Sequence, residues 1–143
     1  MAKGMGNGFP VGGILIHPSI KAEYGMLGTT FGGNHLACAA ALTVLEVLEE
    51  ENLMANALRV SDHFKAKTLD IPKIKNVKGR GLMLGLEFDF DTAAIRKKLI
   101  YDQHIFTGSA KNKNLIRILP PLTLQNEQID QFFEALKIEL DKL

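Results

Sequence analysis

The sequence predicts an α/β protein whose C-terminal half is a compact α+β layer, and two observations support this prediction. The chain has 143 residues, about the length of one domain, and 46% of them are hydrophobic, so it can bury a core. Beyond residues 71–72 (Ile-Pro), the apolar pattern runs strand, strand, helix, strand, strand, helix. The half before residue 71 is mostly helical in pattern and has too few strands for a sheet, so we expect it to belong to a larger fold.

The N-terminal half is expected to contain one strand, a loop and two helices. Asn34 can cap a helix, and residues 36–42 are apolar on all sides of that helix, which is typical of a buried helix. Cys38 lies in this apolar run, so we expect it to be an inert core residue. The expected elements are a short buried strand at residues 11–16, a helical turn at 19–24, a glycine-rich loop at 25–33, and helices at about 35–50 and 52–69, the second with Leu53, Ala57, Val60 and Phe64 on one face.

Beyond residue 72 the expected strands are short and the expected helices are amphipathic. Asp91 can cap the first of these helices, and Thr123 or Asn126 can begin the last. Residues 120–121 (Pro-Pro) end the last strand, because proline has no N–H to donate to a sheet. The expected elements are strands at 74–78, 82–88, 105–107 and 115–119, a helix from 91 to about 103, and a final helix with Ile129, Phe132, Phe133, Leu136 and Leu140 on one face.

Composition and charge argue against several classes of partner. The formal net charge is +1, which gives no electrostatic reason to expect a nucleic acid or an anionic membrane as partner. No apolar run reaches transmembrane length, and no signal peptide opens the sequence. The single cysteine, Cys38, cannot form an internal disulfide, which favours a reducing compartment. We therefore expect a soluble, cytoplasmic protein.

A lysine followed by a glycine-rich run opens the chain. Five of the ten residues from 4 to 13 are glycine, so the backbone there can approach a flat ligand closely. Lys3 would be the amine beside such a ligand, and a desolvated lysine can act as a nucleophile or form a Schiff base. The alternative is a flexible, solvated terminus with a surface lysine. A phosphate-binding loop is excluded, because no Gly-Lys-Ser/Thr follows at the required spacing.

Two adjacent threonines lie in the second glycine-rich segment. Thr29 and Thr30 stand between Gly28 and residues 32–33 (Gly-Gly), and two hydroxyls on such a loop can hold a phosphate group. The alternative is a turn in which the hydroxyls bond to the backbone. The lone His35 has no partner of metal-ligand type, so we expect no metal site there.

Taken together, four separated motifs resemble the class III pyridoxal-phosphate aminotransferases, in the same order and spacing. The first resembles the Schiff-base lysine segment of that family, the second its phosphate-contacting loop, the third the start of its C-terminal small domain, and the fourth its substrate-site arginine segment. The motifs are residues 2–12 (Ala-Lys-Gly…Gly-Phe-Pro-Val-Gly), 28–34 (Gly-Thr-Thr-Phe-Gly-Gly-Asn), 80–85 (Arg-Gly-Leu-Met-Leu-Gly) and 116–122 (Ile-Arg-Ile-Leu-Pro-Pro-Leu). The resemblance covers essentially the whole chain and favours the acetylornithine and succinylornithine branch.

The resemblance implies roles for individual residues. Lys3 would be the Schiff-base lysine and the proton carrier of the transfer. Thr30, with Thr29 beside it, would bind the cofactor phosphate, and in this family that threonine serves the neighbouring subunit of a homodimer. Arg117 would bind a substrate carboxylate, because a guanidinium binds carboxylates with two parallel hydrogen bonds, or would be neutralised by a glutamate when the amino-donor end of the substrate occupies the site. Arg80 would be structural or interfacial.

The resemblance also implies a fold and a reaction. The fold would be the C-terminal portion of a fold-type I pyridoxal-phosphate transferase, with residues 1–33 ending the large domain, 34–72 forming connecting helices and 73–143 forming the small α+β domain. The reaction would move the amino group of N-acetylornithine to 2-oxoglutarate, in arginine biosynthesis. An amino donor and a 2-oxo acid would be the small-molecule partners.

Two alternatives remain open from the sequence. Another class III donor, such as succinylornithine, ornithine or a γ-amino acid, would use the same motifs. A non-catalytic module is the second alternative, because the family's chains are about three times longer by resemblance. We expect the segment by itself to be inactive, since much of the cofactor pocket of the family is missing from it.

Overall fold

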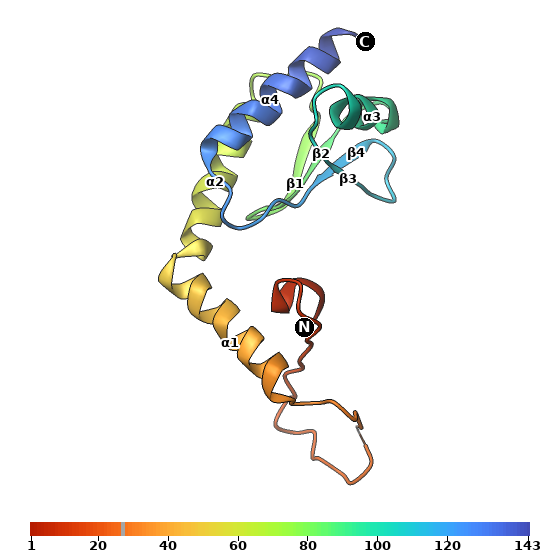
Figure 1. Cartoon of the computed structure of the whole chain (residues 1–143). Helices are drawn as coiled ribbons and strands as arrows, with labels where there is room; N and C mark the ends of the chain where they lie inside the picture. The colour runs from red at the N-terminus through yellow and green to blue at the C-terminus, as the bar shows by residue number, and fades with distance from the viewer. Residues whose placement is uncertain (27) are drawn as a thin grey trace. The chain divides into compact units, whose positions relative to one another are not determined.

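The computed structural model describes residues 1–26 and 28–143, which form two compact units, Met1–Asn52 and Leu53–Leu143 (Figure 1). The first unit contains a short 3-10 helix, η1 (Lys3–Gly6), and a long helix, α1 (His35–Glu50). The second unit contains three helices and four strands. These are α2 (Leu53–Thr68), β1 (Asn76–Arg80), β2 (Met83–Glu87), α3 (Ala93–Tyr101), β3 (Gly108–Ser109), β4 (Leu115–Ile118) and α4 (Asn126–Asp141).

Helix α1 has the predicted bounds and the predicted cap, but its burial differs from the prediction. The side chain of Asn34 accepts a hydrogen bond of 2.9 Å from the backbone N–H of Ala37, as a helix cap requires. Ala37 is the one buried residue of the helix, whereas Leu36 is 72% exposed and Cys38 is exposed. The predictions of a buried helix and an inert core cysteine are therefore wrong. Within this unit the element in contact with α1 is η1, and four residues cannot cover sixteen.

The strand predicted at residues 11–16 is absent, so that prediction is wrong. The segment is irregular, and the side chain of Leu15 is 90% exposed. A strand needs a hydrogen-bonded neighbour, and no other strand occurs in the described part of Met1–Asn52. Instead, the N–H of Gly13 donates to the carbonyl of Met1 at 2.9 Å, and the terminal amine of Met1 donates to the carbonyl of Gly13.

Residues between this segment and α1 form turns. The helical turn expected at 19–24 is replaced by a shorter turn, closed by a 2.9 Å hydrogen bond from the Ile20 N–H to the His17 carbonyl. The described part of the loop expected at 25–33 is irregular, as predicted. Position 27, inside that loop, lies outside the described residues.

The second unit is built on an antiparallel sheet with strand order β1-β2-β4-β3. Its side chains alternate, as in a sheet with one buried face. Leu84, Leu86 and Ile116 are buried on one face, whereas Met83 and Arg117 are exposed on the other. The predicted α+β arrangement of strands and helices is thereby confirmed for this part of the chain.

The shortest strand lies later in the chain than predicted. A strand was expected at residues 105–107, but β3 is Gly108–Ser109. His104 has a left-handed backbone (φ 56°), and the N–H of Ile105 bonds to the Leu99 carbonyl at the end of α3. Because this hydrogen bond ties Ile105 to the helix, pairing with β4 begins only at Gly108.

Helices α2 and α4 pack against each other on the buried side of the sheet (Figure 1). Both apolar stripes predicted for these helices are buried, which confirms them. Phe64 of α2 lies at their centre, with ring centroids 6.0 Å from Phe132 and 4.9 Å from Phe133 of α4. Helix α4 begins at Asn126, one of the two predicted starts.

Helix α3 packs on α4 and begins two residues after its predicted cap. Thr92 occupies the cap position, and the carboxylate of Asp91 accepts a 2.8 Å hydrogen bond from the Ala93 N–H. The hydroxyl of Thr92 donates to the carbonyl of Lys113, which joins the start of α3 to the segment before β4.

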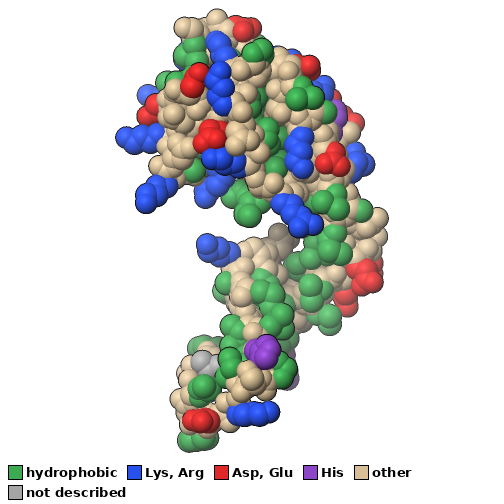
Figure 2. Space-filling view, turned by 180° about the vertical axis from the view of Figure 1, so that it is seen from behind, with side chains coloured by type: hydrophobic (Ala, Val, Ile, Leu, Met, Phe, Trp, Pro, Cys, Tyr) green, Lys and Arg blue, Asp and Glu red, His purple; other side chains and the backbone are tan. Residues whose placement is uncertain are grey.

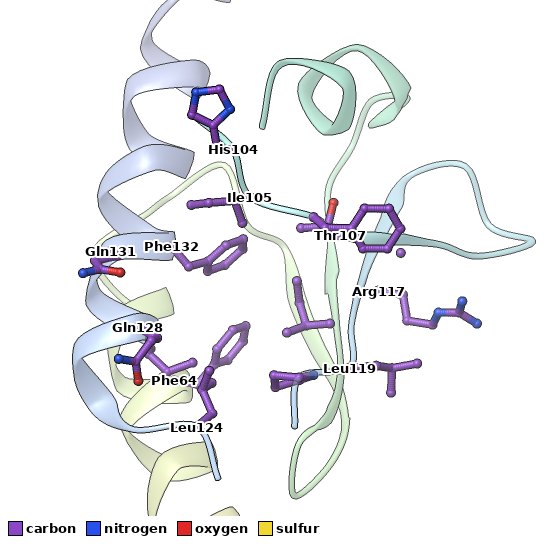
Figure 3. Close-up of a pocket in the computed structure, with 15 residues that line it drawn as sticks. Phe64, His104, Ile105, Thr107, Arg117, Leu119, Leu124, Gln128, Gln131 and Phe132 are labelled. Carbon is purple, nitrogen blue, oxygen red and sulfur yellow. The ribbon is translucent and has the colours of Figure 1, made fainter. Parts of the chain in front are cut away.

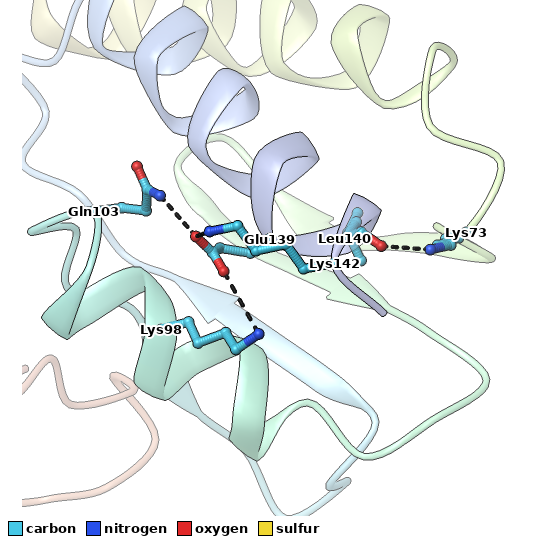
Figure 4. Close-up of polar contacts among 6 residues, drawn as sticks. All are labelled: Lys73, Lys98, Gln103, Glu139, Leu140 and Lys142. Carbon is cyan, nitrogen blue, oxygen red and sulfur yellow. Dashed lines mark hydrogen bonds and ion pairs between the residues drawn. The ribbon is translucent and has the colours of Figure 1, made fainter.

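A buried carboxylate joins α3 to α4 (Figure 4). Glu139 of α4 is fully buried, and its Oε1 accepts hydrogen bonds of 2.7 Å from both Lys142 and Gln103. Lys98 of α3 lies 3.9 Å from its other oxygen. The hydrogen bond from Lys142, followed by that from Gln103, holds the pKa of Glu139 below its usual value, so the buried group is ionised at neutral pH.

Candidate functional site

The site residues predicted from the sequence are divided between the two units. Lys3, Thr29 and Thr30 belong to Met1–Asn52, and Arg117 belongs to Leu53–Leu143.

Lys3 is the first residue of η1 and carries an exposed side chain. Its backbone is left-handed, with φ of 58°, a conformation that residues other than glycine adopt uncommonly. Among the described residues, no hydrogen bond or ion pair engages its amine. The structure thus presents a primary amine to solvent from a short, glycine-containing helix.

Thr29 and Thr30 lie in the turn that leads into α1, and both are exposed. The amide of Asn34 donates to the carbonyl of Phe31 at 2.8 Å while its oxygen caps α1, so the turn is fixed to the start of that helix. Gly33 has φ of 68°, which the turn requires and glycine adopts without strain. The described residues provide no hydrogen bond between Lys3 and either threonine.

Arg117 lies on the exposed face of the sheet, in a row that crosses all four strands. Its neighbours in register are Gly85 of β2 and Gly108 of β3, and Lys78 of β1 is the partner of Gly85. Glycine therefore stands on both sides of Arg117. No side chain from either adjacent position covers its guanidinium.

The carboxylate on the same sheet face is already engaged elsewhere. Glu87 forms a 2.8 Å ion pair with Lys78 and accepts a 2.9 Å hydrogen bond from the amide of Asn112. The hydrogen bond from Lys78, the largest of several contributions, holds the pKa of Glu87 below its usual value. Within the described part of the chain, Arg117 has no carboxylate partner. An unpaired guanidinium on an open face is suited to bind a carboxylate from outside the chain.

A cavity of about 410 Å³ opens beside this arginine at the β3 edge of the sheet (Figure 3). Its floor is apolar and includes Phe64 and Phe132 of the helix layer. In Figure 3, Arg117 points away from these two rings, so the guanidinium lies on the outer side of the sheet. Sequence reasoning did not find this cavity or Gly108. In the sequence, the only signal at this position was that Gly108 follows an expected strand. A glycine in or beside a strand often marks a place where another group approaches the backbone closely.

Arg80 was expected to be structural or interfacial, and that expectation stays a prediction. It ends β1 between Gly79 (φ 107°) and Gly81 (φ 53°), at the turn into β2. A Cβ at position 79 would collide with the carbonyl of Met83, so this tight turn requires glycine there.

Residues 1–26 and 28–143 contain no group of three or more histidine, cysteine or acidic side chains arranged to hold a metal ion. None of their helices has both the length and the apolar character needed to cross a membrane.

Comparison with known proteins identifies the family. The family model for class III aminotransferases matches residues 1–140. The chain belongs to the class III aminotransferases. It is 39% identical to the acetylornithine aminotransferase of Methanocaldococcus jannaschii over 95% of its length, and 35% identical to an ornithine aminotransferase of Exiguobacterium over 98%.

The solved structures agree with this assignment. The crystal structure of the ornithine aminotransferase from Toxoplasma gondii superimposes with a TM-score of 0.70 at 31% identity, over 84% of this chain and 30% of that one. The chain spans 35% of the Methanocaldococcus enzyme and 36% of the Exiguobacterium enzyme. The fold is thus that of a portion of a fold-type I pyridoxal-phosphate transferase, as the sequence predicted.

Pyridoxal phosphate is the cofactor of this family and is present in a structure of the Toxoplasma enzyme. The groups on this chain fit part of what the cofactor needs. Lys3 offers an exposed amine for its aldehyde, and Thr29 and Thr30 offer exposed hydroxyls for its phosphate. These three residues would hold the cofactor.

Proposed function

We propose that this chain supplies the lysine, the phosphate-binding threonines and the substrate arginine of an aminotransferase that uses N-acetylornithine and 2-oxoglutarate. The unpaired guanidinium of Arg117 on an open sheet face is the observation that supports the substrate class most directly. Relatives named acetylornithine aminotransferase, 35–39% identical, support the donor. The reaction would belong to arginine biosynthesis in the cytoplasm.

Each residue has a definite task in this proposal. The amine of Lys3 would hold the cofactor at its aldehyde, and the free amine would carry a proton to and from the substrate carbon. The hydroxyls of Thr29 and Thr30 would donate to the phosphate of the cofactor held by the neighbouring subunit of the proposed homodimer. Arg117 binds a substrate carboxylate with two parallel hydrogen bonds and so fixes the orientation of the substrate. The cofactor itself, when bound, supplies an electron-withdrawing ring that stabilises negative charge on the substrate carbon.

The proposal includes a homodimer. Leu42 and Leu45, three residues apart in α1, share one face of the helix and are both exposed, and Figure 2 shows hydrophobic side chains gathered on the surface of the N-terminal unit. A patch of this kind marks a surface that another protein covers. Gel filtration should give a dimer, and Leu42→Asp together with Leu45→Asp should convert it to a monomer. A parent chain that runs as a monomer contradicts this part of the proposal.

Ornithine as the amino donor is the second candidate, and it is supported by the relatives named ornithine aminotransferase. Because the chain spans about a third of its relatives, we propose that it has no transferase activity by itself. An assay for glutamate formation from 2-oxoglutarate, with either donor, should therefore show no turnover above the free cofactor. Turnover that depends on Lys3 would contradict the proposed inactivity. In that case, comparing the turnover with the two donors identifies the amino donor directly.

Reductive trapping tests the role of Lys3 without requiring turnover. The chain is incubated with equimolar pyridoxal phosphate, reduced with borohydride, and mapped by peptide mass spectrometry. We expect the major adduct on Lys3, lost in Lys3→Met and kept in Lys21→Met, a matched variant of another exposed lysine in the same unit. Adducts spread evenly over Lys65, Lys67 and other surface lysines would contradict the proposed role.

A further inference from the structure

The side chain of Arg117 lies along a strip of bare backbone on β3. Arg117 and Gly108 are direct partners in the β3–β4 ladder. A Cβ placed on Gly108 would lie 2.8 Å from the Nε of Arg117 and 3.3 Å from its Cβ. Real Cβ atoms do not approach a neighbour at 2.8 Å, so any side chain at position 108 must displace the arginine. The arginine therefore occupies space that only glycine leaves free.

The other neighbour of Arg117 is arranged differently. A Cβ on Gly85 would meet the side chain of Leu115, at 2.9 Å from its Cδ2, and not the arginine. Leu115 thus covers Gly85, while Arg117 covers Gly108. The two glycines on either side of the arginine are not equivalent, and the guanidinium is directed toward β3.

The backbone of β3 beneath Arg117 is held in place by helix α3. The guanidinium of Arg96, on α3, donates a 3.1 Å hydrogen bond to the carbonyl of Thr107, the residue before Gly108. Thr107 is buried, and β3 is paired with β4. The backbone beneath Arg117 is therefore anchored by a helix on one side and a strand on the other.

We propose that Gly108 is a positioning residue for Arg117: by leaving its strand bare, it fixes the direction in which the guanidinium meets a substrate carboxylate. This inference rests on the proposed role of Arg117 in binding a dicarboxylic substrate. Two parallel hydrogen bonds to a carboxylate require the guanidinium plane to be in position before binding. A methyl group at position 108 displaces the Nε from the backbone on which it lies, while Gly108 itself has no left-handed φ that alanine would resist.

The test uses the whole chain and two readouts, one of which needs no ligand. The chain has four arginines, so the Nε–H signal of Arg117 can be assigned in a ¹H–¹⁵N spectrum by its loss in Arg117→Lys. Affinity for glutarate, a dicarboxylate without a reactive group, is measured by titration in the same spectra. The variants are Gly108→Ala and, as the matched control, Gly85→Ala. The control adds a methyl group in the same row of the sheet, but that methyl group contacts Leu115 and not Arg117.

We expect Gly108→Ala to shift and broaden the Arg117 Nε–H signal and to weaken glutarate binding about tenfold, because misplacing a binding group by a fraction of an ångström has effects of this order or larger. Gly85→Ala should leave the Nε–H signal unshifted and the glutarate affinity within about twofold of the parent, because the added methyl group meets Leu115 and not the arginine. Thermal unfolding of both variants reports their stability, so a loss of fold is recognised separately.

The outcomes separate this inference from the proposed function. If glutarate binding depends on Arg117 but Gly108→Ala changes neither the Nε–H signal nor the affinity, the positioning role is overturned and the carboxylate-binding role stands. If glutarate fails to bind, or binds equally well to Arg117→Lys, the carboxylate-binding role is overturned. In that case a shifted Nε–H signal in Gly108→Ala still supports the contact between Gly108 and Arg117.

Discussion

Replacing Phe64 by alanine should be among the most damaging single changes to the C-terminal unit. Phe64 has no exposed surface and contacts both Phe132 and Phe133, with ring centroids at 6.0 and 4.9 Å. Truncating a buried phenylalanine costs about 3–5 kcal/mol through lost transfer free energy and the cavity that remains. Small domains have a total free energy of unfolding of about 5–15 kcal/mol, so this change removes a large part of it.

The assay is urea unfolding of the whole chain, followed by far-ultraviolet circular dichroism and by amide signals of the sheet. The matched control is Phe106→Ala, because Phe106 is the same residue type in the same unit but is 85% exposed. The control should change the free energy of unfolding by no more than about 0.5 kcal/mol. If the two variants unfold within about 1 kcal/mol of each other, Phe64 is not in a packed core and the proposed arrangement of α2 and α4 is refuted.

Two further predictions concern stability. Glu139 has a pKa lowered by Lys142 and Gln103, so its stabilising contribution is complete above its unfolded pKa and is lost as the pH falls through its lower folded pKa. Urea titrations from pH 7 to pH 3 should show a shallower loss of stability in Glu139→Gln than in the parent, and identical slopes would contradict the lowered pKa. Asn34→Ala removes the cap on the Ala37 N–H and should cost about 1 kcal/mol of helix stability, seen as faster amide exchange in the first turn of α1. Unchanged exchange there would show that the cap contributes nothing.

Helix patterns were the most predictable part of the fold. The stripe of Leu53, Ala57, Val60 and Phe64 repeats at helical spacing, and the structure buries all four residues. This agreement arises because the periodicity of an amphipathic helix reports directly which face packs. Burial of α1 was not predictable in the same way: its apolar composition is visible in the sequence, but the described residues of its unit leave most of the helix uncovered.

Strands were harder to predict, because a strand exists only where a neighbour supplies hydrogen bonds. Residues 11–16 have a strand-like composition, yet no strand pairs with them in the described part of their unit. The position of β3 was set by the Ile105–Leu99 hydrogen bond and the left-handed His104, two features of the backbone at the end of α3 that the sequence analysis did not predict.

The sequence by itself determined the family of this protein and the types of side chain at the candidate site: the amine of Lys3, the hydroxyls of Thr29 and Thr30, and the guanidinium of Arg117. These are properties of residue type and spacing, which motifs preserve. Only the tertiary structure decided that Arg117 lies over Gly108 on an open sheet face, while Lys78 and Asn112 engage the nearby carboxylate. The physical reason is that these groups belong to strands that are distant in the chain and meet only when the strands pair in register.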